Sequence, residues 1–287
     1  MSKNAESLGN DYIRYTGMMT QTIRNRYNIT VTGKGTQPIL FAHGFGCDQH
    51  MWRYVATAFE AHYQVIRFDY IGHGKASREA YNRERYASLQ GYAQDVLDIC
   101  QDLDLEQIIF VGHSVSSMIG LLASIQEPDR FERLIMVSPS PHYINEEGYT
   151  GGFERADIEE LLDTMDSNFF GWATVMGPAI MANKERPELG QELIHSFCAT
   201  DQAIAQQFAR LTFLGDNRLD LAKIGRPVLI IQSIADDIAP VAVGEYMAQH
   251  IPHNTLRVIQ AQGHSPHVSA PAETIAAIQH YLQATNS

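Results

Sequence analysis

Three side chains in this sequence, Ser114, Asp236 and His264, are of the types that together make a serine reactive. A serine hydroxyl is a weak nucleophile at neutral pH, so it needs a base within hydrogen-bond reach and a third group that orients the base. Here they follow one another in the order serine, aspartate, histidine, which is one of the chain orders known for such a triad. The chemistry that they would perform is acyl transfer, in which the serine attacks a carbonyl carbon.

The candidate nucleophile lies in the segment Gly112-His113-Ser114-Val115-Ser116, which follows an apolar run at residues 108–111 and precedes small and apolar residues. This pattern predicts a strand, a sharp turn and a helix, with the serine at the tip of the turn. The segment matches the G-x-S-x-G nucleophile elbow except at Ser116, where the pattern has its second glycine. Because serine is small, we expect the turn to survive with slightly altered packing.

The candidate acid and base each follow a predicted buried strand. Asp237 is adjacent to Asp236 and is the alternative acid, although the spacing Asp-x-x-x-Pro favours Asp236. His267 lies three residues after His264, a spacing that could also hold a metal ion. No acidic or cysteine ligand is grouped beside this pair, so we expect no metal and a structural role for His267.

An attacking serine also requires donors for the oxyanion that forms on the substrate, and one such donor contributes about 3–4 kcal/mol. The backbone N–H of Val115, directly after the nucleophile, is one candidate. The other is the N–H of Phe45 in the glycine-flanked loop His43-Gly44-Phe45-Gly46. These two groups are the predicted oxyanion hole.

The elements that must position these residues alternate between short apolar runs and helical periods. This alternation predicts the α/β class, with a mostly parallel sheet flanked by helices. The expected strands are residues 27–32, 38–42, 63–69, 108–111, 134–137, 227–233 and 255–259. The expected helices of the core are residues 89–103, 115–127, 240–250 and 271–283.

Residues 142–221 contain no convincing strand, and Gly and Pro breaks divide them into about four helical periods. We therefore expect a flexible N-terminal extension at 1–21, a core at 22–138 and 222–287, and a helical lid at 139–221. Ligands of open α/β sheets bind at the carboxyl ends of the strands, where this lid would lie. The candidate substrate-binding residues are Phe45 and four apolar residues of the lid: Trp172, Met176, Phe208 and Phe213.

Composition narrows the class of function. The 287 residues carry a formal net charge of −12, which argues against a nucleic-acid or anionic-membrane surface. The three cysteines are widely spaced, so neither a disulfide framework nor a zinc site is indicated, and we expect a cytoplasmic protein. No dinucleotide fingerprint, signal peptide or membrane span is recognisable, and we expect no cofactor and no membrane partner.

Several motifs together resemble the RsbQ-type α/β-hydrolases, a family that includes a bacterial regulator of the sigma-B stress response and has the plant karrikin and strigolactone receptors as relatives. The resemblance runs from about residue 25 to residue 284. The motifs are His43-Gly44-Phe45-Gly46-Cys47-Asp48-Gln49 with Trp52, Phe68-Asp69-Tyr70, Gly91-Tyr92-Ala93-Gln94-Asp95-Val96, Val111-Gly112-His113-Ser114-Val115, Gly151-Gly152-Phe153 and Gly171-Trp172-Ala173-Thr174.

The resemblance implies an α/β-hydrolase fold with an inserted four-helix lid and assigns the triad roles to Ser114, Asp236 and His264. It also implies hydrolysis of an ester or lactone, such as a butenolide, by a serine esterase. The alternative that it implies is a stress-response regulator that binds and activates a PAS-domain phosphatase of the RsbP kind. In that case hydrolysis would be slow or incidental.

Overall fold

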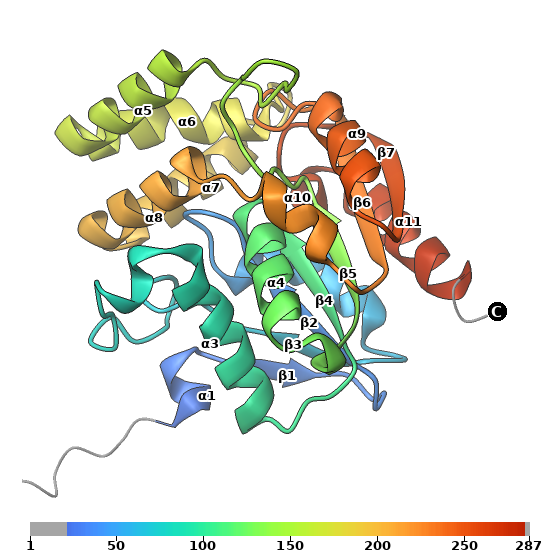
Figure 1. Cartoon of the computed structure of the whole chain (residues 1–287). Helices are drawn as coiled ribbons and strands as arrows, with labels where there is room; N and C mark the ends of the chain where they lie inside the picture. The colour runs from blue at the N-terminus through green and yellow to red at the C-terminus, as the bar shows by residue number, and fades with distance from the viewer. Residues whose placement is uncertain (1–21, 285–287) are drawn as a thin grey trace, which may run out of the picture.

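One seven-stranded sheet runs through the part of the chain that the computed structural model describes, residues 22–284 (Figure 1). The strand order is β1-β3-β2-β4-β5-β6-β7, and every neighbouring pair is parallel except β1 with β3. The expected extension at residues 1–21 lies outside the described residues. The strands are β1 (Thr30–Thr32), β2 (Pro38–Ala42), β3 (Gln64–Arg67), β4 (Ile108–His113), β5 (Phe131–Val137), β6 (Val228–Ala235) and β7 (Asn254–Gln262).

Helices cover both faces of the sheet, and the side chains of β4 alternate between the two cores that result. Ile108 and Phe110 pack into the core beneath α3, α4 and α9, whereas Ile109 and Val111 pack into the core beneath α2 and α11. Burial on both faces explains why the strand is a continuous apolar run. The helices of the core are α1 (Ile23–Arg26), α2 (Arg53–Ala56), α3 (Leu89–Asp102), α4 (Val115–Gln126), α9 (Val241–His250), α10 (Pro266–Ser269) and α11 (Pro271–Ala284).

Four further helices are inserted between β5 and β6 and lie together on one side of the core (Figure 1). They fall within residues 139–221, the segment expected to form the lid. No helix within residues 22–284 is both long enough and apolar enough to cross a membrane. The inserted helices are α5 (Arg155–Ser167), α6 (Phe169–Met181), α7 (Pro187–Ala199) and α8 (Gln202–Leu214).

The first expected strand, residues 27–32, was too long at its start. Tyr27 ends the short helix α1, and Asn28 has a φ of 47°, a conformation that interrupts an extended strand. The Asn28 side chain donates instead to Asp69 (2.6 Å). As a result β1 begins only at Thr30.

Candidate active site

The serine of the elbow stands at the tip of a tight turn between β4 and α4. Ser114 has a φ of 55°, a strained conformation for a residue with a side chain. The turn is crowded, because a Cβ on Gly112 would lie 2.6 Å from the carbonyl oxygen of Ser116. Glycine is therefore needed at position 112, whereas serine fits at position 116.

Hydrogen bonds join the three candidate catalytic side chains. Ser114 Oγ lies 2.8 Å from His264 Nε2, and His264 Nδ1 lies 2.8 Å from Asp236 Oδ2. A carboxylate oxygen accepts, so the proton of the imidazole is on Nδ1 and Nε2 is free to accept from the serine hydroxyl. All three side chains are buried, which excludes competing water from these bonds.

The loop after β6 presents the candidate acid. Asp236 Oδ1 accepts from the backbone N–H groups of Ile238 (2.9 Å) and Ala239 (3.0 Å), which leaves Oδ2 for the imidazole. Asp237, the alternative acid, is exposed. The geometry therefore brings Asp236, and not its neighbour, to His264.

The loop after β7 presents the candidate base, and helix α6 contacts this loop. His264 N donates to the carbonyl oxygen of Ile180 (2.9 Å). Gly263 has a φ of 81°, and a Cβ there would lie 2.1 Å from the carbonyl oxygen of Met181. On the other side, His113 Nε2 donates to the carbonyl oxygen of His264 (2.8 Å).

The two candidate oxyanion donors belong to two different segments, the start of α4 and the loop after β2. Val115 is the first residue of α4, so its N–H has no acceptor within the helix. Phe45 follows Gly44 in the loop after β2, and a Cβ on Gly44 would lie 2.4 Å from His113 Nδ1. This close approach seats the loop directly against the elbow strand.

Tyr143, which no sequence motif indicated, also reaches Ser114. Its hydroxyl lies 3.1 Å from Ser114 Oγ, and the residue is buried. Burial raises the pKa of Tyr143, so the phenol keeps its proton. Because the serine proton faces His264, we assign Tyr143 as the donor in this bond. The sequence signal that could have indicated Tyr143 is its position shortly after β5, which ends at the same edge of the sheet as the strands that precede Ser114, Asp236 and His264.

A small apolar cavity of about 30 Å³ lies above the serine. The lining residues at or after the carboxyl ends of the core strands are called the floor of the cavity. Those contributed by α6, α7 and α8 are called its roof. The floor consists of Phe45, Cys47, His113, Ser114, Tyr143, Ile238, His264 and Ser265. The roof consists of Ile180, Leu193, Phe197, Thr212 and Phe213. This volume is large enough to hold at least one water-sized molecule.

The structure distributes the five predicted substrate-binding residues over three places. Phe45 and Phe213 line the cavity. Trp172 and Phe208 are not among the described lining residues; their rings lie one layer back, each with its centroid 6.0 Å from that of Phe45. Met176 is half-buried in a separate outer groove between α5 and α6, which Trp172 also lines.

Two further buried polar side chains near the site do not supply chemistry at the serine. Burial raises the pKa of the Cys47 thiol, so this cavity residue stays protonated and is a poor nucleophile. His267 is fully buried, with its ring centroid 4.4 Å from Trp52 and 4.3 Å from His113. Within residues 22–284 no group of three or more metal-ligating side chains is present.

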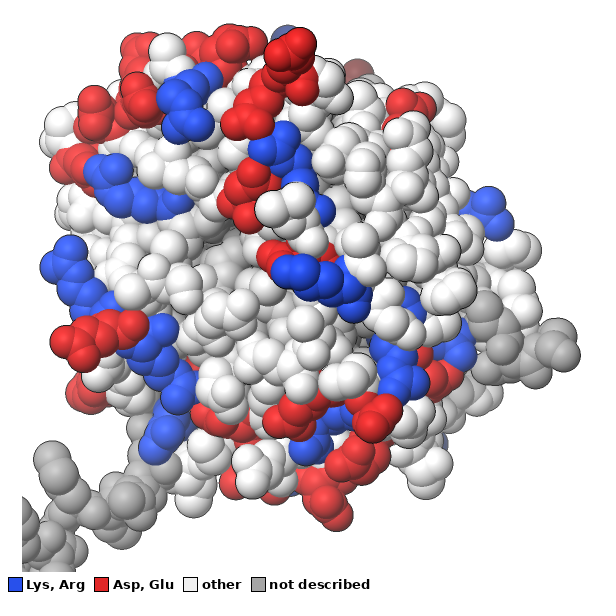
Figure 2. All heavy atoms as spheres, in the orientation of Figure 1, with Lys and Arg blue, Asp and Glu red and all other residues white. Residues whose placement is uncertain are grey.

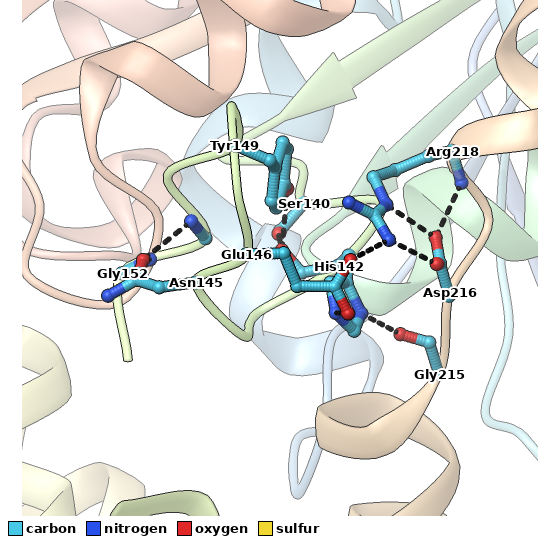
Figure 3. Close-up of polar contacts among 10 residues, drawn as sticks. Ser140, His142, Asn145, Glu146, Tyr149, Gly152, Gly215, Asp216 and Arg218 are labelled. Atoms are coloured by element: carbon cyan, nitrogen blue, oxygen red, sulfur yellow. Dashed lines mark hydrogen bonds and ion pairs between the residues drawn. The ribbon is translucent and has the colours of Figure 1, made fainter. Parts of the chain in front are cut away.

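Two chain segments connect the inserted helices to the core, and polar contacts tie these segments to each other (Figure 3). His142 Nδ1 donates to the carbonyl oxygen of Gly215 (2.7 Å). Arg218 forms ion pairs with Glu146 and Asp216, both at 2.6 Å. The tyrosine that reaches the nucleophile directly follows His142 in the chain. The two connections are therefore fixed close to the floor of the cavity.

The chain belongs to the α/β-hydrolase fold family, because the sequence profile of this family matches residues 37–271. It is 44% identical to a hydrolase from Oleispira antarctica of known structure, with a TM-score of 0.89 over 91% of this chain and 96% of that one. It is 36% identical to karrikin insensitive 2 receptor IA of Petunia hybrida, over 91% of this chain and 95% of the receptor. It is 34% identical to strigolactone esterase RMS3 of Pisum sativum, over 88% of this chain and 96% of the esterase.

Proposed function

We propose that the protein is a serine hydrolase that cleaves an ester or lactone of a small apolar molecule. The observation that carries this proposal is the hydrogen-bonded array of Ser114, His264 and Asp236 beneath a cavity lined mainly by apolar side chains. Relatives named as a strigolactone esterase and a hydrolase are consistent with this chemistry.

In the first half of the proposed reaction, Ser114 Oγ bonds to the carbonyl carbon of the substrate and its proton passes to His264 Nε2. Asp236 stabilises the imidazolium that forms, and the N–H groups of Phe45 and Val115 bind the oxyanion. The intermediate collapses, the carbon–oxygen bond of the ester breaks, and His264 protonates the departing alkoxide. An acyl group remains on the serine.

In the second half, water attacks the acyl carbon and gives its proton to His264, and the serine leaves with that proton restored. A carboxylic acid is released. With a lactone the alcohol stays attached to the acyl group, so one ring-opened product forms.

The test is turnover of p-nitrophenyl acetate and of a fluorogenic butenolide by the wild type and by Ser114→Ala. Wild-type turnover that falls by at least about 10³-fold in the variant is the expected result. Equal turnover by the two proteins would rule out the mechanism. The exposed Asp237→Asn serves as a matched control for protein quality.

A second candidate function is the regulatory one, in which the protein binds a PAS-domain phosphatase of the RsbP kind as the RsbQ-type resemblance implies. The surface of the lid favours it, because Phe170 and Val175 on α6 are 66% and 68% exposed. Residues 139–221 contain 14 acidic and 5 basic side chains, so this segment carries −9 of the net charge of −12. Acidic side chains gather over the inserted helices in Figure 2.

A pull-down with a PAS-domain phosphatase tests this second function. Retention of the phosphatase by the wild type and by Ser114→Ala, together with its loss in Phe170→Ala/Val175→Ala, is the expected pattern. Failure of the wild type to retain the phosphatase would refute it.

A further inference from the structure

We propose that Ser116, the residue that departs from the G-x-S-x-G pattern, is a positioning residue that fixes the oxyanion-hole loop relative to the nucleophile. This inference rests on the proposed hydrolase function and concerns how the same site is held together. Ser116 is the second residue of α4 and is completely buried. Its hydroxyl joins the elbow helix to the loop that carries Phe45.

The direction of each hydrogen bond at Ser116 follows from the groups involved. Ser116 Oγ donates to the carbonyl oxygen of His43, which can only accept. Tyr70 Oη lies 3.0 Å from Ser116 Oγ, and it must donate because the only proton of Ser116 is already committed. Both capacities of the serine hydroxyl are thus used inside the protein.

The imidazole of His43 completes the network. The backbone N–H of Tyr70 donates to His43 Nε2 (3.2 Å), so the proton of the ring is on Nδ1. Nδ1 in turn donates to the carbonyl oxygen of Gly44 (2.9 Å). Burial lowers the pKa of His43, which keeps the ring in this neutral form. The carbonyl groups of two successive loop residues therefore have fixed partners.

The position of Ser116 in the chain makes this network relevant to the chemistry. Ser116 directly follows Val115, the first candidate oxyanion donor, and it binds His43, which lies two residues before Phe45, the second donor. Its hydroxyl therefore sets the separation of the two N–H groups. A glycine at position 116 would leave the carbonyl oxygen of His43 and the hydroxyl of Tyr70 without the partner that they have here.

The experiment compares Ser116→Ala and Ser116→Gly with the wild type, using p-nitrophenyl acetate and an aryl trifluoromethyl ketone. The hemiketal that the ketone forms with serine places an oxyanion in the hole, so its affinity reports the geometry of the donors. We expect kcat per titrated active site to fall about 10-fold, less than the 10²–10³-fold for losing a donor altogether. We expect KM to change less than about twofold, and the affinity for the ketone to fall with kcat.

Ser124→Ala is the matched control, because Ser124 is also buried in α4 but donates only to Leu121 of its own helix (2.8 Å). Tyr70→Phe, which keeps the bond from Ser116 to His43, covers the case in which the Ser116 variants fail to fold. It should lower kcat less than threefold, and a fall of 10-fold or more would contradict the assigned directions.

The outcomes separate this inference from the proposed function. An inactive wild type, or a fully active Ser114→Ala, would overturn the function. An active wild type whose Ser116 variants lose thermal stability but keep kcat and ketone affinity would overturn the positioning role alone.

Discussion

The floor of the cavity holds its groups through directional polar contacts, whereas the roof consists mainly of apolar side chains that pack without fixed direction. On the floor, Ser114 Oγ and His264 Nε2 lie 2.8 Å apart, and His113 holds the backbone carbonyl of His264. Asp236, which does not itself line the cavity, lies 2.8 Å from His264 Nδ1. In the roof, Phe197 and Phe213 contact the ring of Phe45 at centroid distances of 5.7 and 5.8 Å. From this difference we expect the floor to set the rate of reaction and the roof to set the choice of substrate.

The largest expected effect is at Asp236, which orients His264 of the floor. Asp236→Asn replaces the oxygen that accepts from His264 Nδ1 with an amide that can donate to it, which favours the wrong tautomer of the base. We expect kcat for p-nitrophenyl acetate to fall by about 10³–10⁴-fold. Asp237→Asn is the matched control and should stay within about twofold of the wild type. Equal losses of kcat in the two variants would contradict the assignment of Asp236, and not Asp237, as the acid.

The next effect is on stability, and it arises from four buried histidines. One of them, His113, belongs to the floor, whereas the five roof residues have no titratable side chain. Burial lowers the pKa of His43, His73, His113 and His267, to about 3 in His73 and His113. Neighbouring histidines add to the lowering of the pKa in His73, His113 and His267. A depressed pKa means that the unfolded chain binds the proton more tightly. The contribution of these neutral histidines to the free energy of unfolding is therefore fully present above about pH 6.5 and is lost as the pH falls towards 3.

At pH 5 each of His73 and His113 should cost about 2 kcal/mol of unfolding free energy relative to pH 7.5. Asp95 acts in the opposite direction, because burial raises its pKa to about 7, so the net loss is smaller than the sum over the histidines. Urea denaturation at the two pH values measures this net loss of unfolding free energy. His195→Gln, at an exposed histidine of α7, should leave the pH dependence unchanged. Equal stability at both pH values would contradict the assignment of neutral buried histidines.

A smaller effect, on specificity, is expected in the roof. Phe213→Ala removes a ring whose centroid lies 5.3 Å from that of Tyr143 and so enlarges the cavity. The ratio of kcat/KM for p-nitrophenyl butyrate to that for the acetate should rise about 10-fold. Phe170→Ala, an exposed residue of the same lid, is the control and should leave the ratio unchanged. A fall in activity on both esters by the same factor would mean that the roof also sets the rate.

The smallest effect is expected where the inserted helices join the core. Arg218→Gln removes the ion pairs with Glu146 and Asp216, whose side chains are more than a third exposed. Such pairs are weakened by solvent, so the unfolding free energy should fall by less than about 1 kcal/mol and kcat by less than twofold. A tenfold loss of kcat would show that this connection controls the floor, and the comparison of floor and roof would then fail.

Sequence reasoning succeeded where a residue's place follows from its position in an element. The α/β-hydrolase fold was predicted and is confirmed by the family match and by the sheet. Ser114, Asp236 and His264 follow β4, β6 and β7, and because parallel strands end at one edge of a sheet, their proximity could be predicted. Their catalytic roles, the lid boundaries at 139–221 and the cytoplasmic location stay predictions.

The rest depends on how helices pack, which a single sequence does not determine. Phe208 and Phe213 are both buried and apolar in α8, but Phe208 stacks on Tyr92 (4.5 Å between centroids) while Phe213 lines the cavity. Met176 has the same apolar character as its neighbours, yet it lies in the outer groove. Tyr143 follows β5 in a loop with no motif, so only the folded geometry brings its hydroxyl to the serine.

The central claim is that Ser114 is the activated nucleophile, and covalent labelling tests it most directly. Wild type and Asp236→Asn are treated with a fluorophosphonate at pH 7.5, and the modified peptide is identified by mass spectrometry. We expect one label per chain, on Ser114, formed at least about 10²-fold faster in the wild type than in Asp236→Asn. A label on any other residue, or equal rates in the two proteins, would contradict it.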